Sequence, residues 1–140
     1  MFVPELCKNC RVPEKIQRYL PRENGRISDT ALRARLIDFQ MNGYAQQLTQ
    51  QRAVEELQAR APGFTSSAVK LTNALQVQEG DELLLAAMGS QGVGVAGAGF
   101  SEDELAISRA WLYQKSLTIA GGTKEVQLNI IAKRVLGLPD

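Results

Sequence analysis

The sequence predicts an all-α protein folded as an up-and-down helical bundle, and three observations support this prediction. Apolar residues recur at helical spacing in four segments, about 28–61, 65–88, 102–120 and 124–136. Capping residues, glycines or prolines mark the ends of these segments. No segment shows the alternation that is typical of a half-buried strand, so we expect no strand in the chain.

Length and charge limit the class of protein. The 140 residues fit one domain, and about two thirds of the unfolded surface could be buried on folding. The formal net charge is +1 with acids and bases interspersed, which argues against a nucleic-acid groove and a polybasic membrane anchor. No apolar run reaches the roughly 20 residues that a membrane helix needs, and residues 1–20 carry charges where a signal peptide needs an apolar centre. We therefore expect a cytoplasmic protein without nucleic-acid or membrane partners.

The chain has no histidine and two cysteines. Any proton transfer would therefore fall to a carboxylate, lysine, tyrosine or cysteine. Cys7 and Cys10 form a Cys-x-x-Cys motif, which is found in zinc sites and redox pairs. A zinc site needs two more nitrogen or sulfur ligands that this chain lacks, and a redox pair would sit beside a strand–helix–strand pattern that is missing. We interpret the two residues as ordinary thiols and expect no metal site.

Residues 1–27 are predicted to be a loosely specified segment before a helical domain at 28–140. Prolines at 4, 13 and 21 allow only a short helix at about 13–20, with Pro13 at its first position. The helix at 28–61 begins at Ser28 and Asp29, which supply a cap and an acidic first turn, and ends at Pro62 and Gly63. We expect its two apolar stripes to form one wide buried face: Leu32, Leu36, Phe39 and Gly43, and Ile37, Met41, Tyr44 and Leu48.

The second helix is expected to start after Phe64, with Thr65, Ser66 or Ser67 as its cap, and to run to about Met88. Its end is apolar nearly all round, so the run Leu83-Leu84-Leu85 should be buried on several sides or cover an interface with another subunit. Lys70 lies among apolar residues, and we interpret it as a snorkelling or ion-paired lysine rather than a functional one.

Residues 89–100 follow as a flexible glycine-rich loop. The loop contains G-V-G-V-A-G, but no strand precedes it, so we reject a dinucleotide fingerprint. Ser101 and Glu104 then form a capping box that opens a third helix, which runs into Gly121. Ala110, Tyr113 and Leu117 should share one face of this helix, beside Ile107 and Trp111.

The last helix has the best-marked start. Gly121 and Gly122 interrupt the preceding helix, Thr123 can cap the next, and Glu125 places a negative charge in its first turn. An apolar stripe of Leu128, Ile131, Val135 and Leu138 follows, with Lys133 and Arg134 in the last turns and Gly137 and Pro139 at the end. Exposed backbone N–H groups at such a start can bind a phosphate, although a plain capped turn is the commoner meaning of this pattern.

The run IAGGTKEVQLNIIAKRVLGLP closely resembles the C-terminal helix of flavin-dependent acyl-CoA dehydrogenases. The resemblance covers about 28–140, one helical domain out of the three in that family. It implies the removal of a proton next to a thioester carbonyl and the transfer of a hydride to FAD. In many members the base is the glutamate of a Glu-Gly-Thr motif, whose first position is Gly121 here. We therefore expect no catalytic residue in this chain.

The resemblance also implies a partial FAD site that contacts the adenine or pyrophosphate. Its expected residues are Gly121, Gly122, Thr123, Glu125 and Gln127, with Gly89 near the pyrophosphate. Ala86 stands where many members carry a glutamine that holds the flavin. The expected partners are a second copy, in a dimer or tetramer, or the family's missing N-terminal domains, and acyl-CoA would bind only with those domains. The alternative is a catalytically silent helical interaction module.

Overall fold

The computed structural model describes residues 12–61, 63 and 65–139, so Cys7 and Cys10 lie outside the described residues. The elements, in chain order, are α1 (Val12–Ile16), β1 (Arg22–Glu23), β2 (Arg26–Ile27), α2 (Thr30–Gln58), α3 (Thr65–Met88), η3 (Gly89–Val93), α4 (Glu102–Gln114), η4 (Lys115–Thr118), α5 (Lys124–Ile130) and η5 (Ile131–Val135).

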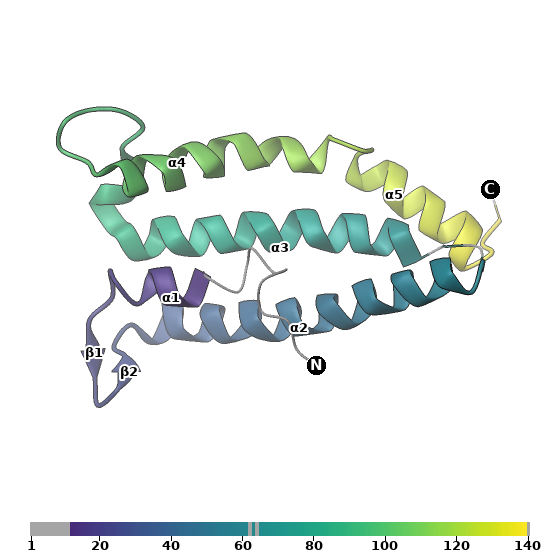
Figure 1. Cartoon of the computed structure of the whole chain (residues 1–140), viewed down its shortest axis with the longest axis horizontal. Helices are drawn as coiled ribbons and strands as arrows, with labels where there is room; N and C mark the ends of the chain where they lie inside the picture. Colours follow the sequence, from purple (N-terminus) through teal and green to yellow (C-terminus); the bar gives the residue numbers. More distant parts are fainter. Residues whose placement is uncertain (1–11, 62, 64, 140) are drawn as a thin grey trace.

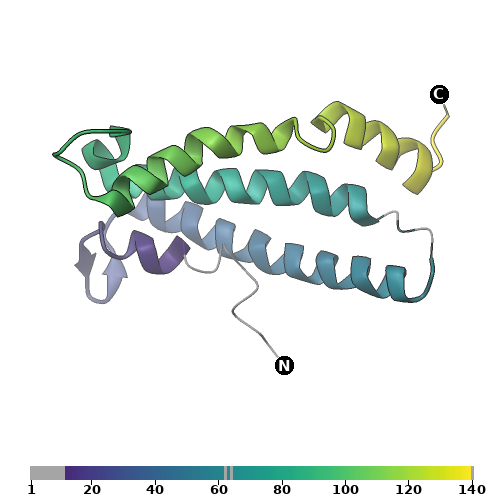
Figure 2. The ribbon, with the colours of Figure 1, turned by 45° about the horizontal axis from the view of Figure 1, so that its top comes forward.

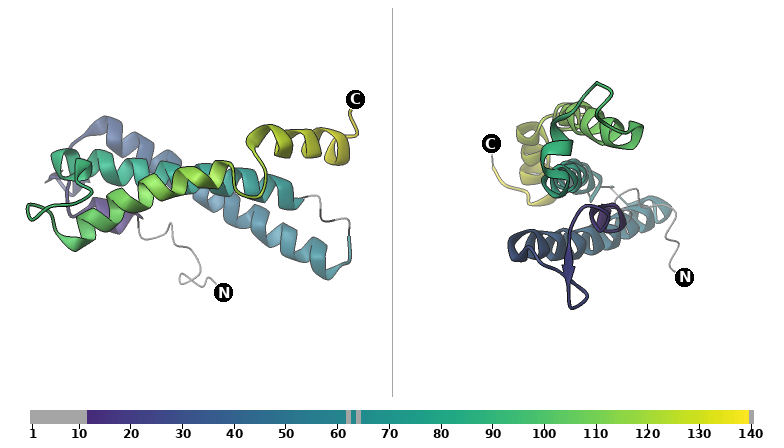
Figure 3. Two further views of the ribbon diagram at one scale, coloured as in Figure 1. Left: turned by 90° about the horizontal axis from the view of Figure 1, so that it is seen from above. Right: turned by 90° about the vertical axis from the view of Figure 1, so that its left-hand side faces the viewer.

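The three long helices α2, α3 and α4 run alternately up and down, and α3 lies between the other two (Figures 1 and 3). Helix α5 continues in the direction of α4 along the same side of α3, after a bent connection (Figure 2). The short α1 packs against the other end of α3, where the chain also forms its small hairpin (Figure 1). The predicted all-α, up-and-down bundle is confirmed.

The prediction of no strand was wrong at one place. β1 and β2 form a two-stranded antiparallel hairpin that pairs Arg22 with Ile27 and Glu23 with Arg26. The turn residues Asn24 and Gly25 have φ of 52° and 76°, which is the left-handed conformation that tight hairpin turns require. The Asn-Gly dipeptide is the strongest short-range signal for such a hairpin.

The helix starts are as predicted where a cap was recognised. Asp29 Oδ1 accepts hydrogen bonds from the backbone N–H groups of Ala31 and Leu32, each at 2.9 Å. Ser101 and Glu104 make the complete capping box at the start of α4. Helix α3 has the expected bounds, Thr65–Met88.

Three other segments differ from their predicted lengths. Helix α1 ends at Ile16 rather than near Leu20. Helix α4 ends at Gln114 and gives way to the 3₁₀ turn η4 instead of running to Gly121. The glycine-rich loop begins with the 3₁₀ helix η3, Gly89–Val93, and Gly94 leaves it in an extended conformation. A Cβ at Gly94 would lie 2.5 Å from the ring of Phe100, so the loop folds closely over that ring.

The core lies where α1, α2 and α4 meet the C-terminal half of α3. Leu83 is fully buried and Leu84 is 4% exposed, so the expected burial of this end is provided within the chain and needs no second subunit. The buried apolar residues around them are Val12, Ile16, Ile27, Leu36, Phe39, Ala87, Met88 and Ile107. A Cβ at Gly80 would lie 3.2 Å from the Phe39 ring, so α2 and α3 approach closely here.

Two expected buried faces are wrong. On α2, Leu36 and Phe39 are buried, but the stripe of Ile37, Met41, Tyr44 and Leu48 is exposed. Successive residues turn by about 100° around a helix, so this stripe cannot share the face that Phe39 turns toward α3. On α4, Tyr113 is 75% exposed, and Leu105, Ile107 and Ser108 form the buried face instead.

Candidate functional site

The turn before α5 is built on two glycines in the left-handed region. Gly121 has φ of 71° and Gly122 has φ of 100°. Glycine is required at Gly122 for its conformation, and a Cβ there would lie 2.9 Å from Gln127 Nε2, so the Gln127 amide would have to shift. A Cβ at Gly121 would meet only Lys70 Cε, at 3.8 Å, which is ordinary contact.

Two side chains hold the carbonyl oxygens of this turn. The ammonium of Lys70, on α3, donates to the carbonyl oxygen of Gly122. The amide of Gln127, on α5, donates to the carbonyl oxygen of Gly121 at 2.8 Å, and the Gln127 side chain is buried. The turn is therefore fixed from both sides, by Lys70 of α3 and by Gln127 of α5, the helix that it precedes.

The start of α5 is capped from within the chain. Thr123 Oγ1 accepts the backbone N–H of Val126 at 3.5 Å, as expected of an N-cap. The pKa of Glu125 is lowered, first because its carboxylate accepts from its own backbone N–H and then because it accepts from the Thr123 hydroxyl. The Glu125 carboxylate therefore already occupies hydrogen-bond donors at the start of α5, and an incoming anion would have to compete with it for them.

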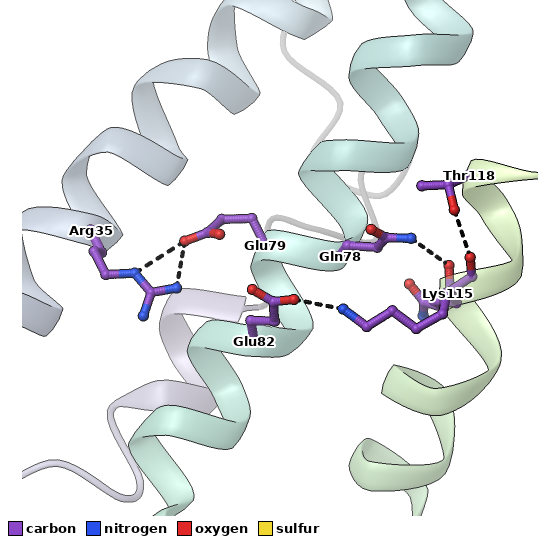
Figure 4. Close-up of polar contacts among 7 residues, drawn as sticks. Arg35, Gln78, Glu79, Glu82, Lys115 and Thr118 are labelled. Carbon is purple, nitrogen blue, oxygen red and sulfur yellow. Dashed lines mark hydrogen bonds and ion pairs between the residues drawn. The ribbon is translucent and has the colours of Figure 1, made fainter. Parts of the chain in front are cut away.

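A polar seam joins α3 to α2 and α4 in the middle of the bundle (Figure 4). Lys115 Nζ lies 2.6 Å from Glu82 Oε1 and 5.1 Å from the centre of the Trp111 ring. Gln78 donates to the carbonyl oxygen of Gln114 at 3.0 Å. On the other side of α3, Arg35 and Glu79 pair at 2.8 Å.

Beside this seam, three buried polar atoms have no hydrogen-bond partner within the described residues: Asp81 Oδ2, Trp111 Nε1 and Gln114 Oε1. Burial raises the pKa of Asp81 to about 6, although the positive charges of Lys115 and Lys15 oppose the shift. Burying an ionised carboxylate without a hydrogen-bond partner lowers the stability of the folded state. Asp81 is an acidic residue in this situation.

A family comparison decides what kind of domain carries this turn. The profile described as "Acyl-CoA dehydrogenase, C-terminal domain" matches residues 14–136, which is most of the chain. The chain belongs to the acyl-CoA dehydrogenase family. The match begins ahead of Ser28, so it includes α1 from Glu14 onward and the whole hairpin.

One relative of known annotation is "Acyl-CoA dehydrogenase IpdE1" from Mycolicibacterium smegmatis (strain ATCC 700084 / mc(2)155). It is 31% identical over 120 residues, which is 86% of this chain and 29% of the relative. The matched region therefore spans less than a third of the length of this acyl-CoA dehydrogenase. No solved structure gives a significant match.

Most residues expected at a flavin site of this family member come together in one turn. Gly121, Gly122, Thr123, Glu125 and Gln127 all belong to the start of α5. Gly89 directly follows Met88, the last residue of α3, whereas the turn lies beside Lys70 near the start of α3. About 18 residues of α3 lie between Lys70, which contacts the turn, and the end of the helix before Gly89. This length of helix corresponds to a distance on the order of 27 Å.

The remaining expected positions lack the side chains that the family's chemistry uses. Gly121 has no side chain where many acyl-CoA dehydrogenases carry the base, and Ala86 is exposed near the far end of α3. Across 12–61, 63 and 65–139, no group of three or more acidic, histidine or cysteine side chains could hold a metal ion. In the same ranges, no helix has both the length and the apolar content to cross a membrane.

Sequence reasoning missed the role of two residues of α3. Lys70 was expected to snorkel or to form an ion pair, but its ammonium binds the Gly122 carbonyl, 52 residues away in sequence. Asp81 gave only a weak signal, an acid two positions before the apolar run that starts at Leu83. Neither the Lys70 contact nor the burial of Asp81 follows from spacing along one helix, because both depend on how α3 packs against the rest of the bundle.

Proposed function

We propose that this chain is the C-terminal helical domain of an FAD-dependent acyl-CoA dehydrogenase that acts on an acyl-CoA thioester together with the family's other domains. In this proposal it supplies contacts to the adenine or pyrophosphate of FAD and a surface for self-association. The α,β-dehydrogenation itself needs a base and the acyl-CoA pocket, and Gly121 provides no base. The isolated chain is therefore inactive.

The observation that carries the proposal is the conformation of the Gly121–Gly122 turn. Both glycines are left-handed, and a Cβ at Gly121 would meet only Lys70 Cε at 3.8 Å, so the backbone at Gly121 is open to close approach by a ligand, whereas Gln127 fills the space beside Gly122. Lys70 adds a positive charge beside the turn. A turn with these features suits the phosphate-bearing part of FAD better than the apolar isoalloxazine.

The fit to FAD is partial. The amide of Gln127 is already used by Gly121, and the carboxylate of Glu125 occupies part of the helix start. A bound pyrophosphate would have to attract the Lys70 ammonium away from the Gly122 carbonyl and displace the Glu125 carboxylate from the helix start. The Glu125 side chain is exposed, so it can move. We expect a dissociation constant no tighter than about tens of micromolar, because few contacts must offset the entropy lost on association.

Titration of the full chain with FAD, followed by amide shifts in NMR, tests the proposal. Shifts at 121–127 that saturate, together with unchanged shifts at Gly99 in the distant loop, are expected. The variant Gly122→Ala should lose them. Absence of shifts at 121–127 at millimolar FAD would contradict the flavin contact.

A second candidate function is a catalytically silent interaction module. It is favoured by the missing carboxylate at position 121 and by the internally satisfied start of α5. The two candidates agree that octanoyl-CoA, FAD and a dye acceptor give no turnover with this chain alone. They differ in the FAD titration, since the silent module predicts no saturable shift at 121–127.

A further inference from the structure

The dipeptide Asn-Gly occurs twice in the chain, in two different backbone settings. Asn24-Gly25 forms the turn between β1 and β2, at the end of the bundle where the hairpin lies (Figure 1). Asn42-Gly43 lies near the middle of α2, a helix of 29 residues. Both asparagines are exposed, so the accessibility of the side chain does not distinguish them.

An asparagine followed by glycine can lose its side-chain amide without an enzyme. The backbone nitrogen of the glycine bonds to Cγ of the asparagine, the Cγ–Nδ2 bond breaks, and ammonia leaves with the proton of the backbone amide. Water then opens the five-membered imide. Cleavage between the nitrogen and Cγ gives aspartate, and cleavage between the nitrogen and the backbone carbonyl carbon gives isoaspartate. Glycine favours ring closure because no side chain crowds the attacking nitrogen.

The hairpin leaves Asn24-Gly25 open to this reaction. The ladder pair nearest the turn is Glu23 with Arg26, so Asn24 and Gly25 take no part in the ladder. A Cβ at Gly25 would have nothing within 4 Å, so no other segment of the described chain crowds the turn. Each strand has two residues, and a two-stranded hairpin is only marginally stable, so its backbone opens at a low cost in free energy.

Asn42-Gly43 has the opposite setting. In an α-helix each backbone N–H donates to the carbonyl four residues earlier, so the Gly43 nitrogen belongs to the hydrogen-bond ladder of α2. Gly43 also packs against α3, because a Cβ there would lie 3.1 Å from Gln76 Nε2. Gln76 in turn donates to the Phe39 carbonyl at 2.7 Å. Ring closure at Asn42 therefore requires the middle of α2 to unwind and to leave α3, which costs more free energy than opening the hairpin.

We propose that Asn24 is a site of spontaneous deamidation and that α2 protects Asn42, although both belong to the same dipeptide. The reaction needs only this chain and water. It does not depend on FAD or on the family's other domains, so it stands apart from the proposed function.

Isoaspartate at position 24 changes the hairpin itself. It adds one carbon atom to the backbone of a turn that has two residues, so the register of Glu23 with Arg26 cannot be kept. Strand β2 holds Ile27, which is buried in the core and whose carbonyl accepts from Arg33 Nη1 at 3.1 Å. Unpairing of the strands therefore removes support from a core residue and should lower the melting temperature.

Incubation of the folded chain at mildly alkaline pH, followed by peptide mass spectrometry, tests the site. Trypsin places the two dipeptides in separate peptides, 23–26 and 36–52. Each deamidation raises the peptide mass by about one dalton, and an isoaspartate-specific methyltransferase labels the isoaspartate product. Asn24 should react at least about tenfold faster than Asn42, which corresponds to a difference of about 1.4 kcal/mol in the free energy of opening. Comparable rates, a faster reaction at Asn42, or no mass gain at Asn24 would overturn the proposal.

The unfolded chain separates the effect of the fold from that of the sequence. In urea that unfolds the chain, the two asparagines should react within about threefold of each other, because neither backbone is then held. A ratio that stays above about tenfold in urea would show that neighbouring residues set the rates, and it would overturn the protection by α2.

The variant Asn24→Gly tests the consequence for stability. Glycine adopts positive φ in the turn and has no amide to lose. The wild-type chain should melt at a lower temperature after incubation than before it, whereas Asn24→Gly should melt at the same temperature before and after. An equal loss in both chains, or no loss in the wild type, would overturn the effect of isoaspartate on the hairpin.

Discussion

The ammonium of Lys70 binds the carbonyl oxygen of Gly122 and so connects the first third of α3 to the turn that precedes α5. The two residues are 52 positions apart in sequence. Helix α5 is short, and its apolar residues Val126 and Leu128 are about half exposed, so packing alone holds it weakly. A charged hydrogen bond to the turn therefore has more influence on the position of α5 than it would have in a well-packed helix.

Lys70→Met should loosen the turn while keeping the apolar stem of the side chain. Loss of a hydrogen bond from a charged donor at a half-buried position costs about 1 kcal/mol of the free energy of unfolding. Urea denaturation measures this cost, and amide hydrogen exchange at 121–127 should become faster. Lys124→Met makes the same chemical change at an exposed position and should alter stability by less than about 0.5 kcal/mol. Equal effects of the two substitutions would show that the Gly122 contact contributes nothing.

Gly122→Ala should destabilise the chain by more than about 1 kcal/mol. The new Cβ would lie 2.9 Å from Gln127 Nε2, and φ of 100° is strained for any residue with a side chain. Gly99→Ala is the matched control, since a Cβ there has nothing within 4 Å. It should be neutral or slightly stabilising. A thermal melt of both variants distinguishes them, and a Gly122→Ala variant as stable as Gly99→Ala would refute the requirement for glycine.

The helix starts could be predicted because their causes are local. The hydrogen bonds of Asp29 and of the Ser101–Glu104 box join residues within three positions of each other, so the sequence pattern contains both partners. The hairpin was equally local, since Asn24-Gly25 carries its own signal, and it was missed because the prolines around it were given more weight. Its correct prediction would have needed only the turn preference of that dipeptide.

The buried faces were harder to predict because they depend on which helices are present to cover them. Both stripes of α2 are apolar at helical spacing, and nothing along the helix says that Phe39 meets α3 while Tyr44 meets solvent. The same limit applies to the candidate site. The glycine turn and its cap follow from residues near 121–125, whereas the contact of Lys70 depends on the tertiary position of α3.

Ser101→Ala should lower the stability of α4. The Ser101 hydroxyl accepts the backbone N–H of Glu104 at 3.3 Å, and the Glu104 carboxylate accepts the backbone N–H of Ser101 at 2.8 Å. Removal of such a cap costs about 1 kcal/mol. Ser116→Ala removes a hydroxyl that only donates to the Tyr113 carbonyl within its own turn, and it should cost less. Chemical denaturation of both variants compares their losses in unfolding free energy. A larger loss for Ser116→Ala than for Ser101→Ala would contradict the prediction.

Asp81→Asn should stabilise the chain near neutral pH and have little effect near pH 4. Burial raises the pKa of Asp81 from 3.8 to about 6, against the opposing charges of Lys115 and Lys15 and with a smaller contribution from Glu82. The folded state therefore holds this proton more tightly than the unfolded state does. The stability that the protonated form provides is fully present below pH 4 and is lost as the pH rises through about 6. A shift of about two pKa units corresponds to at most about 3 kcal/mol, and remaining solvent contact reduces this to about 1 to 2 kcal/mol.

Asparagine carries no charge at any of these pH values, so the difference in unfolding free energy between variant and wild type should grow from pH 4.5 to pH 8. Urea titrations at pH 4.5, 6 and 8 measure it, with the exposed Asp38→Asn as the control that should show no such trend. A difference that is constant with pH, or that grows toward acid, would mean that the Asp81 carboxylate is not the buried charge that opposes folding at neutral pH.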